Sequence, residues 1–230
     1  MKSISNIKAE DGLQILLDIP PQSEKLFGST ATESVLSFLS RHHTEEFSIG
    51  DLVEAVDYSQ PSVSKAVTVL SETDLVVERR EGNTRWVQIN HERLHVPDDP
   101  YLQIPQAEFQ IPVRTAATTL RSELDGAIGI VLYGSVARGE ADRRSDIDLW
   151  VLVEGDRMAN QRAANEVKQA LEEEEFENGR YEYEIDIEAL QAVPKYISEI
   201  RDVLSDGIVI HETEKFQTVR NMVFHGDLDE

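Results

Sequence analysis

Two aspartates two positions apart, Asp146 and Asp148, stand where the chain becomes strongly apolar. Residues i and i+2 of a β-strand point to the same face, so both carboxylates would share one face while Ile147 and Leu149 share the other. Carboxylates this close repel each other unless a cation lies between them. Hard oxygen ligands of this kind suit Mg²⁺ that also takes oxygens from a triphosphate. The pair therefore predicts a magnesium site that handles a nucleotide.

A glycine–serine turn stands upstream of the aspartates and is suited to hold phosphates. The apolar run 127–133 predicts a buried strand, and Gly134 and Ser135 follow it at once. The turn supplies backbone N–H groups and a hydroxyl at a helix start, where phosphate oxygens bind readily. A second strand, which carries both aspartates, is expected over 145–153.

Two motifs in this region resemble the signature of the DNA polymerase beta-like nucleotidyltransferase superfamily, most closely its minimal (MNT) type: Gly134-Ser135-x-Ala137-Arg138-Gly139 and Ser145-Asp146-x-Asp148-Leu149. The resemblance covers roughly residues 113–212. It implies that Asp146 and Asp148 hold two Mg²⁺ ions, that Ser135 binds the β- and γ-phosphates of ATP, and that pyrophosphate leaves. The nucleotide-binding residues are then Gly134, Ser135, Arg138 and Ser145, whereas Arg143 and Arg144 either contact phosphates or have no specific role.

The resemblance also implies a third carboxylate on a neighbouring strand. Residues 181–188 alternate, with tyrosines and isoleucines on one face and acids on the other. Asp186 lies between two isoleucines, and members of the family carry their third aspartate in such an apolar strand. Asp186 is therefore the expected third catalytic and metal-binding carboxylate, with Glu184 and Glu188 as alternatives. Glu182 is typical of a solvated strand face.

The region 30–90 has the order of elements of a winged helix-turn-helix domain. Apolar helix patterns over 32–41, 48–56 and 59–70 precede a two-stranded hairpin that turns at 81–83, and 47–49 reads as a short strand. Ser48 and Ser59 are the expected N-caps, and Pro61 lies in the first turn of its helix, where a missing N–H costs least.

The third of these helices resembles the recognition helices of winged-helix transcriptional regulators. The side chains expected to face DNA are Gln60, Ser62, Ser64 and Lys65 on this helix, and Arg79, Arg80, Asn83 and Arg85 on the wing. The alternative is a winged helix used only for dimerisation or protein contact. Winged helices often pair, so a homodimer is a further expectation.

The predicted fold class is α+β (α/β), in four segments. They are an N-terminal arm (1–29), a winged helix-turn-helix domain (30–90), a linker (91–112) and a nucleotidyltransferase domain (113–230) with a small mixed sheet flanked by helices. Four prolines predict an extended linker. In the last segment we expect helices near 113–124 and 163–175, and then a helix, an edge strand over 207–211 and a final helix. The histidines are expected in capping or surface positions.

The charge balance of the 230 residues is strongly acidic, with 22 Lys and Arg against 44 Asp and Glu and a net charge of −22. The acid is spread along the chain and Arg outnumbers Lys by 15 to 7, a composition that resembles halophilic proteins. The absence of cysteine excludes disulfides, thiolate metal sites and cysteine nucleophiles. Neither a signal peptide nor a membrane span is recognisable, so we expect a cytoplasmic protein with no membrane partner.

Three functions fit these features. The resemblance to the MNT type implies an antitoxin that transfers AMP from ATP to a hydroxyl of a HEPN-type toxin, with the winged helix binding operator DNA for autoregulation. A second reading is nucleotide transfer to a small molecule such as an aminoglycoside, which would normally require a larger C-terminal helical region. A third is a transcriptional regulator whose nucleotidyltransferase domain only senses nucleotide.

Overall fold

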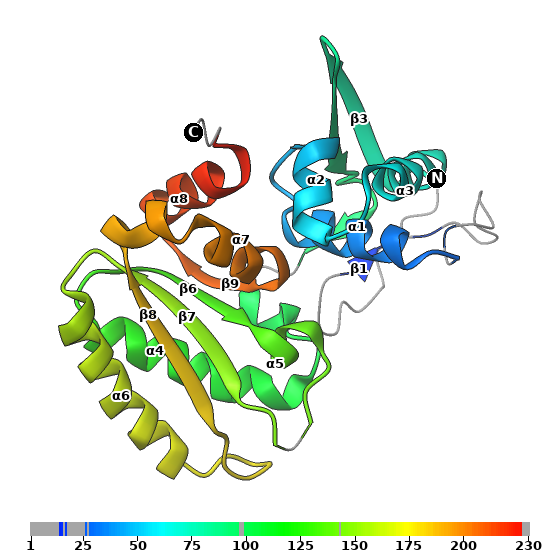
Figure 1. Cartoon of the computed structure of the whole chain (residues 1–230). Coiled ribbons are helices and arrows are strands. Elements are labelled where there is room, and N and C mark those ends of the chain that lie inside the picture. Colours follow the sequence, from blue (N-terminus) through cyan, green and yellow to red (C-terminus); the bar gives the residue numbers. More distant parts are fainter. Residues whose placement is uncertain are drawn as a thin grey trace.

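The computed structural model describes residues 14–15, 17, 26, 28–96, 99–142 and 144–226. The winged helix and the second, larger sheet lie side by side, with two C-terminal helices between them (Figure 1). None of the helices in these ranges is long and apolar enough to cross a membrane. Most of the expected N-terminal arm lies outside the described residues, and the part that is described includes the short strand β1 (Gln14–Ile15).

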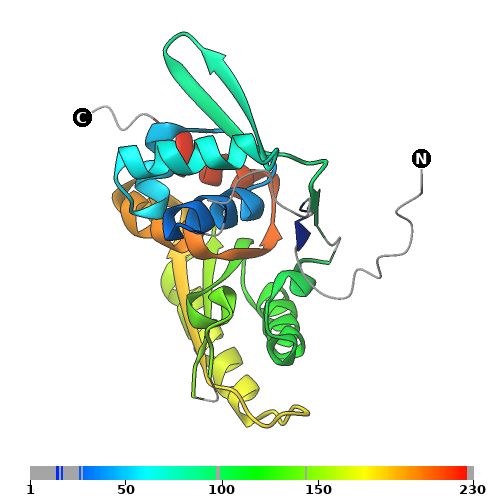
Figure 2. The same ribbon diagram turned by 90° about the vertical axis from the view of Figure 1, so that its right-hand side faces the viewer.

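The winged helix follows the expected order of elements. Its helices are α1 (Thr30–Arg41), α2 (Ile49–Val56) and α3 (Gln60–Glu72), and its sheet has the strand order β2 (Phe47–Ser48), β4 (Thr84–Ile89), β3 (Val76–Glu81). Ser48 caps α2 as expected: its hydroxyl accepts from the Asp51 N–H, and the Asp51 carboxylate accepts from the Ser48 N–H. The hairpin β3–β4 extends away from the rest of the molecule (Figure 2).

The second domain is built on a four-stranded sheet of order β8 (Tyr183–Ala189), β7 (Ile147–Val153), β6 (Ala127–Tyr133), β9 (Ile208–Glu212). Only β7 and β8 are parallel, and α6 (Arg157–Glu173) connects them. Helices α4 (Gln110–Glu123) and α6 cover one face of the sheet, and α7 (Ile197–Asp206) and α8 (Glu214–His225) pack near the other. The short helix α5 (Gly134–Arg138) follows β6 directly.

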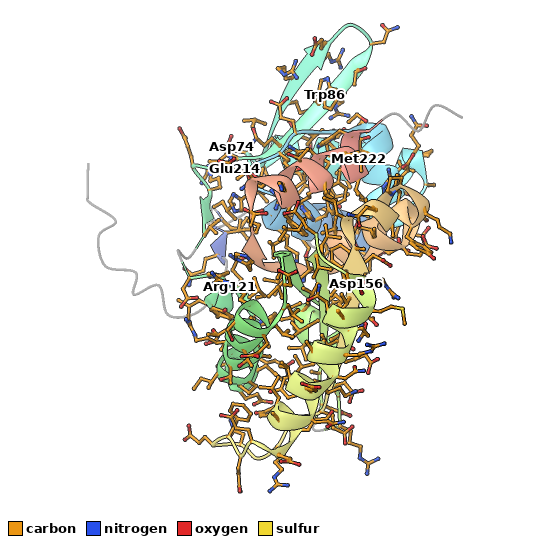
Figure 3. All side chains as sticks on the ribbon, turned by 90° about the vertical axis from the view of Figure 1, so that its left-hand side faces the viewer. Asp74, Trp86, Arg121, Asp156, Glu214 and Met222 are labelled. Carbon is orange, nitrogen blue, oxygen red and sulfur yellow. The ribbon has the colours of Figure 1, made fainter. Side chains whose placement is uncertain are left out.

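The helix α6 begins at Arg157 rather than at Ala163, the expected start. Asp156 lies at the start of this helix (Figure 3) and caps it, because its carboxylate accepts from the Ala159 N–H at 2.8 Å. The first turns of α6 are polar and hold the buried Asn160, whose amide binds the backbone of Asp125. An apolar periodicity therefore does not reveal this end of the helix.

The segment 91–112, expected as an extended linker, is packed and partly helical. It contains β5 (Leu94–His95), which pairs with β1, and two 3₁₀ helices, η1 (Pro100–Gln103) and η2 (Ala107–Phe109). Ile104 and Phe109 are buried in the core under α4. Helix α4 begins at Gln110 rather than Val113, because Pro112 falls within its first turn, where the missing N–H would have no partner in the helix.

One apolar cluster contains residues of both domains. Phe224 of α8 packs against Phe38 and Phe47 of the winged helix, with ring centroids 5.8 and 5.7 Å away. His42 lies among these rings, 4.4 Å from Phe38 and 4.9 Å from Phe224, and is 3% exposed. His42 is the C-cap residue of α1, as the expected capping role has it, but its side chain is not at the surface, because rings of α1, β2 and α8 surround it.

Candidate functional site

The strand register places the predicted carboxylates on one face of the sheet. Asp148 of β7 is paired with Glu184 of β8, and Trp150 is paired with Asp186. Paired residues of neighbouring strands point to the same face, and the alternate residues of both strands are buried on the other face against α4 and α6. Asp146 precedes β7 as an exposed residue. The three predicted aspartates and Glu184 thus lie near one another along the first half of β7.

The negative charges of this cluster act on Asp148. Its burial and the nearby charges of Asp146, Glu184 and Asp186 together raise the pKa of the Asp148 carboxyl to about 6, and Arg138 opposes them. The arrangement therefore carries more negative charge than the surrounding side chains neutralise. A divalent cation would relieve this repulsion, and carboxylate oxygens are the ligand type that Mg²⁺ takes.

Asp186 differs from the two alternatives for the third carboxylate in its partners. Glu184 pairs with Lys168 Nζ at 3.1 Å, and Glu188 pairs with Arg157 Nε at 3.2 Å. Within the described ranges, Asp186 has no cation at ion-pair distance. Its carboxylate instead accepts a hydrogen bond from the Tyr133 hydroxyl at 2.9 Å.

Tyr133 was not among the predicted site residues. It ends β6, is paired with Asp148, and reaches across β7 to Asp186. Burial and then the hydrogen bond to Asp186 raise the pKa of its phenol, so it stays a donor at neutral pH. The alternation of side chains along β6 could have identified Tyr133. Ile130 and Leu132 point into the core under α4, so Tyr133, an odd-numbered residue of the same strand, points to the opposite face, where the aspartates lie.

Gly134 is packed directly against Asp148. Its φ of 72° lies in the left-handed region, and a β-carbon at this position would lie 2.1 Å from Asp148 Oδ2. Ser135 follows in α5, half-buried, and its hydroxyl makes no hydrogen bond to any described residue. Arg138 ends α5 and pairs with Glu140 at 2.9 Å. The predicted glycine–serine turn is therefore in contact with one of the predicted aspartates, Asp148.

Ser145 has a structural partner of its own. Its hydroxyl accepts from the Asp142 N–H at 2.9 Å and so holds the loop before β7. Together with Arg144 and Arg180 it lines a cavity of about 630 Å³ that Phe109 and Tyr181 also border. Arg143 lies outside the described residues.

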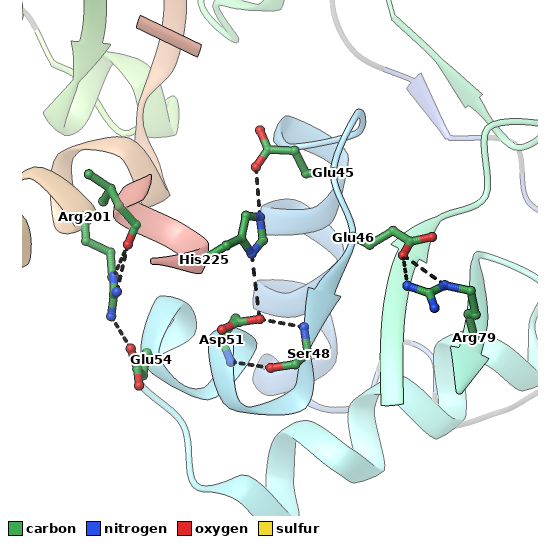
Figure 4. A network of polar contacts seen from close by, with 9 residues as sticks. Glu45, Glu46, Ser48, Asp51, Glu54, Arg79, Arg201 and His225 are labelled. Atoms are coloured by element: carbon green, nitrogen blue, oxygen red, sulfur yellow. Dashed lines mark hydrogen bonds and ion pairs between the residues drawn. The ribbon is translucent and has the colours of Figure 1, made fainter. Parts of the chain in front are cut away.

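The predicted DNA-facing residues of α3 and the wing differ in exposure and in whether other side chains already bind them. Gln60 and Lys65 are exposed, whereas Ser62 and Ser64 are half-buried, and the hydroxyls of Ser62 and Ser59 are 2.9 Å apart. On the wing, Arg80 and Asn83 are exposed. The other two arginines are bound by acids: Arg79 by Glu46 at 2.8 Å (Figure 4) and by Glu81, and Arg85 by Glu78 at 2.5 Å.

Family models match both parts of the chain. Residues 118–216 match the model described as polymerase beta, nucleotidyltransferase, and residues 34–85 match the model of the MarR family. The chain joins a MarR-type winged helix to a polymerase beta-type nucleotidyltransferase domain. The arsenical resistance operon repressor of Staphylococcus aureus is 33% identical over 67 residues, which make up 29% of this chain and 62% of the repressor. No solved structure matches.

The match to the nucleotidyltransferase model includes the whole acidic cluster, from Gly134 to Asp186, and also the α7 region. The match to the winged helix begins within α1 and ends at Arg85, on the wing. As the carboxylates of the nucleotidyltransferase domain are placed, no three acidic or histidine side chains in the described ranges converge closely enough to hold a metal ion.

Proposed function

We propose that the nucleotidyltransferase domain transfers AMP from ATP to a protein hydroxyl with Mg²⁺, as an MNT-type antitoxin acting on a HEPN-type toxin. The winged helix then binds operator DNA and regulates the operon of the pair. The observation that carries the proposal is the contact of the glycine–serine turn with Asp148, a member of an acidic cluster in which burial and the neighbouring negative charges together raise the pKa of this carboxyl to about 6.

The residues have separate roles in this proposal. Asp146, Asp148 and Asp186 would hold two Mg²⁺ ions, which supply positive charge at the phosphates and at the acceptor hydroxyl. Ser135 offers a half-buried hydroxyl without a partner in the described ranges, suited to a phosphate oxygen. Tyr133 fixes the orientation of Asp186 through its hydrogen bond.

The packing of the C-terminal helices favours a protein acceptor over a small molecule. Helices α7 and α8 are the elements that follow the acidic strand and could build a pocket for a small acceptor. Both are instead packed against the winged helix, through the cluster around Phe224 and through the pair of Arg201 with Glu54. An acceptor that brings its own surface needs no such pocket.

The test is intact-mass spectrometry of the chain with its neighbouring gene product after incubation with Mg²⁺ and ATP in concentrated KCl. We expect whole AMP units on the partner protein. The double substitution Asp146→Ala/Asp148→Ala should abolish the adduct. Glu182→Ala removes a nearby exposed acid and should leave the adduct unchanged.

The absence of an adduct on any protein, with ATP binding still measurable, would overturn transfer to a protein. The regulator that senses nucleotide would then become the better reading. An adduct that survives the double substitution would show that the acidic cluster does not carry the chemistry.

A further inference from the structure

Arg41, the last residue of α1, donates hydrogen bonds from the winged helix into the nucleotidyltransferase domain. Its Nη1 binds the carbonyl of Asp206 at 2.6 Å, and its Nη2 binds the carbonyl of Ala137 at 3.2 Å. Asp206 ends α7, and Ala137 lies in α5, directly after the glycine–serine turn. One side chain of the DNA-binding domain therefore joins two helices of the other domain.

The carbonyl of Ala137 is one of the C-terminal carbonyls of α5 that need a hydrogen-bond donor from outside the helix. The last carbonyls of a helix have no partner within it. At the end of α5, the N–H groups of Gly139 and Glu140 turn back to the carbonyls of Val136 and Ser135. The Ala137 carbonyl is left, and in the described part of the chain Arg41 is its donor.

Arg41 makes this contact beside a cavity between the domains, where its guanidinium is partly buried. A cavity of about 500 Å³ lies between the two domains, bordered by Arg138 at the end of α5, by Asp57 after α2, and by Arg41 itself. Burial, opposed by the nearby charge of Asp206, lowers the pKa of the Arg41 guanidinium. Placing a cation there is unfavourable unless its N–H groups are bonded, as they are to both carbonyls.

We infer that Arg41 is a positioning residue for nucleotidyl transfer: from the winged helix, it holds α5 so that Gly134 stays packed on Asp148 and Ser135 faces the nucleotide. The inference rests on the proposed function for its catalytic consequence. The nucleotidyltransferase site is then completed by a residue of the DNA-binding domain.

The first measurement is hydrogen–deuterium exchange of the full chain without nucleotide. We expect Arg41→Ala to speed exchange of the amides of 134–140 about tenfold, because α5 loses its tie to the winged helix. Arg201→Ala is the matched control, since Arg201 of α7 also bridges the domains, to Glu54, and forms no hydrogen bond or ion pair with α5 among the described residues. Arg41→Lys, which keeps the charge but loses the planar fork of two nitrogens that each bind one carbonyl, should be intermediate.

The second measurement is nucleotidyl transfer by the same proteins. We expect Arg41→Ala to raise KM for ATP about tenfold with a smaller change in kcat, and Arg201→Ala to leave KM unchanged. Exchange at 134–140 that is unaltered, or that rises equally in Arg201→Ala, would overturn the inference. If Arg41→Ala fails to fold, Arg41→Lys decides by the same two readouts.

The two proposals fail in different ways. A parent protein that transfers no nucleotide contradicts the proposed function, while the exchange experiment still tests whether Arg41 holds α5. A parent protein that transfers nucleotide, with Arg41→Ala equal to it in exchange and KM, contradicts the role of Arg41 alone.

Discussion

Gly134 and Asp148 share one space: a β-carbon on Gly134 would stand 2.1 Å from the Asp148 carboxylate oxygen Oδ2. The turn that would receive phosphates and the strand that would hold the metal are thus fitted to each other at atomic contact. A change at either residue is transmitted to the other, although fourteen positions separate them in the sequence.

Gly134→Ala should weaken nucleotide binding and lower transfer by about 100-fold, because the methyl group must displace Asp148 and a misplaced catalytic group is costly. The φ of 72° adds about 1 kcal/mol of backbone strain. Titration with ATP and Mg²⁺, followed by fluorescence or calorimetry, measures the loss. Gly82→Ala is the control, since Gly82 has a φ of 58° and open space around it. Equal nucleotide affinity in the two variants would contradict the argument.

Tyr133→Phe should raise the Mg²⁺ concentration needed for half-maximal transfer several-fold and lower the rate about tenfold. The substitution removes the hydrogen bond that orients Asp186 and little else, so the melting temperature should barely move. A Mg²⁺ titration of the transfer rate is the measurement. Tyr181→Phe, which loses a hydroxyl bonded to the Glu108 carbonyl outside the cluster, should behave as the parent protein. A parent-like Mg²⁺ midpoint in Tyr133→Phe would count against a role for Tyr133.

Stability should fall as the pH drops below about 6.5, through His42. Burial lowers the pKa of His42 from 6.5 to about 4, with Arg220 and Arg41 acting in the same direction and Glu45 against it. Between these values the unfolded chain binds the proton and the folded chain does not. The loss in the free energy of unfolding is therefore small above pH 6.5 and reaches about 2 kcal/mol at pH 5.

Chemical denaturation at pH 5 and pH 7.5 tests this dependence on His42. His42→Phe should show a smaller loss of stability at pH 5 than the parent protein, while His91→Gln, at an exposed position, should match the parent. If His42→Phe loses as much stability at pH 5 as the parent protein does, the buried imidazole is not the group responsible.

On the DNA-binding face, Lys65→Ala and Arg80→Ala should weaken binding to duplex DNA more than Arg79→Ala. Lys65 and Arg80 form no ion pair with any residue in the described ranges, whereas Arg79 is already bound by Glu46 and Glu81. Lys65→Ala and Arg80→Ala should each reduce the slope of log affinity against log salt concentration by about 1, because each removes one phosphate contact. Binding measured by fluorescence anisotropy at several salt concentrations gives the slope.

A complementary variant is Glu78→Gln, which frees Arg85 on the wing. It should increase affinity for DNA over the parent protein. If affinity is insensitive to Lys65, Arg80 and Glu78 alike, the winged helix serves a contact other than DNA.

Much of the fold was predictable from local patterns. The strand 127–133 is observed with its predicted ends, and the alternation of 181–188 is observed as buried Tyr183, Ile185 and Ile187 against exposed Glu184 and Asp186. The order of the winged helix followed from the apolar periods and from the cap at Ser48. These features depend on neighbours in the sequence, so the sequence contains them.

The remaining features depend on contacts between distant segments. The bond of Tyr133 to Asp186 needs the strand order β8-β7-β6, which no local pattern specifies. The start of α6 is obscured by Asn160, a polar residue that is buried because the backbone of Asp125 meets it. Arg41 and His42 look like an ordinary basic helix end in the sequence, because the rings of Phe47 and Phe224 and the carbonyls that Arg41 binds come from other elements.

The packing of Phe224 on Phe38 and Phe47 bears on how this chain can be divided. Each half, cut free of the other, would present aromatic surface to water, and the chain should melt in a single transition rather than in two. A variant that lacks either domain should therefore need polar substitutions at the aromatic residues that the removal exposes. The winged helix and the nucleotidyltransferase domain are, in this sense, two parts of one interior.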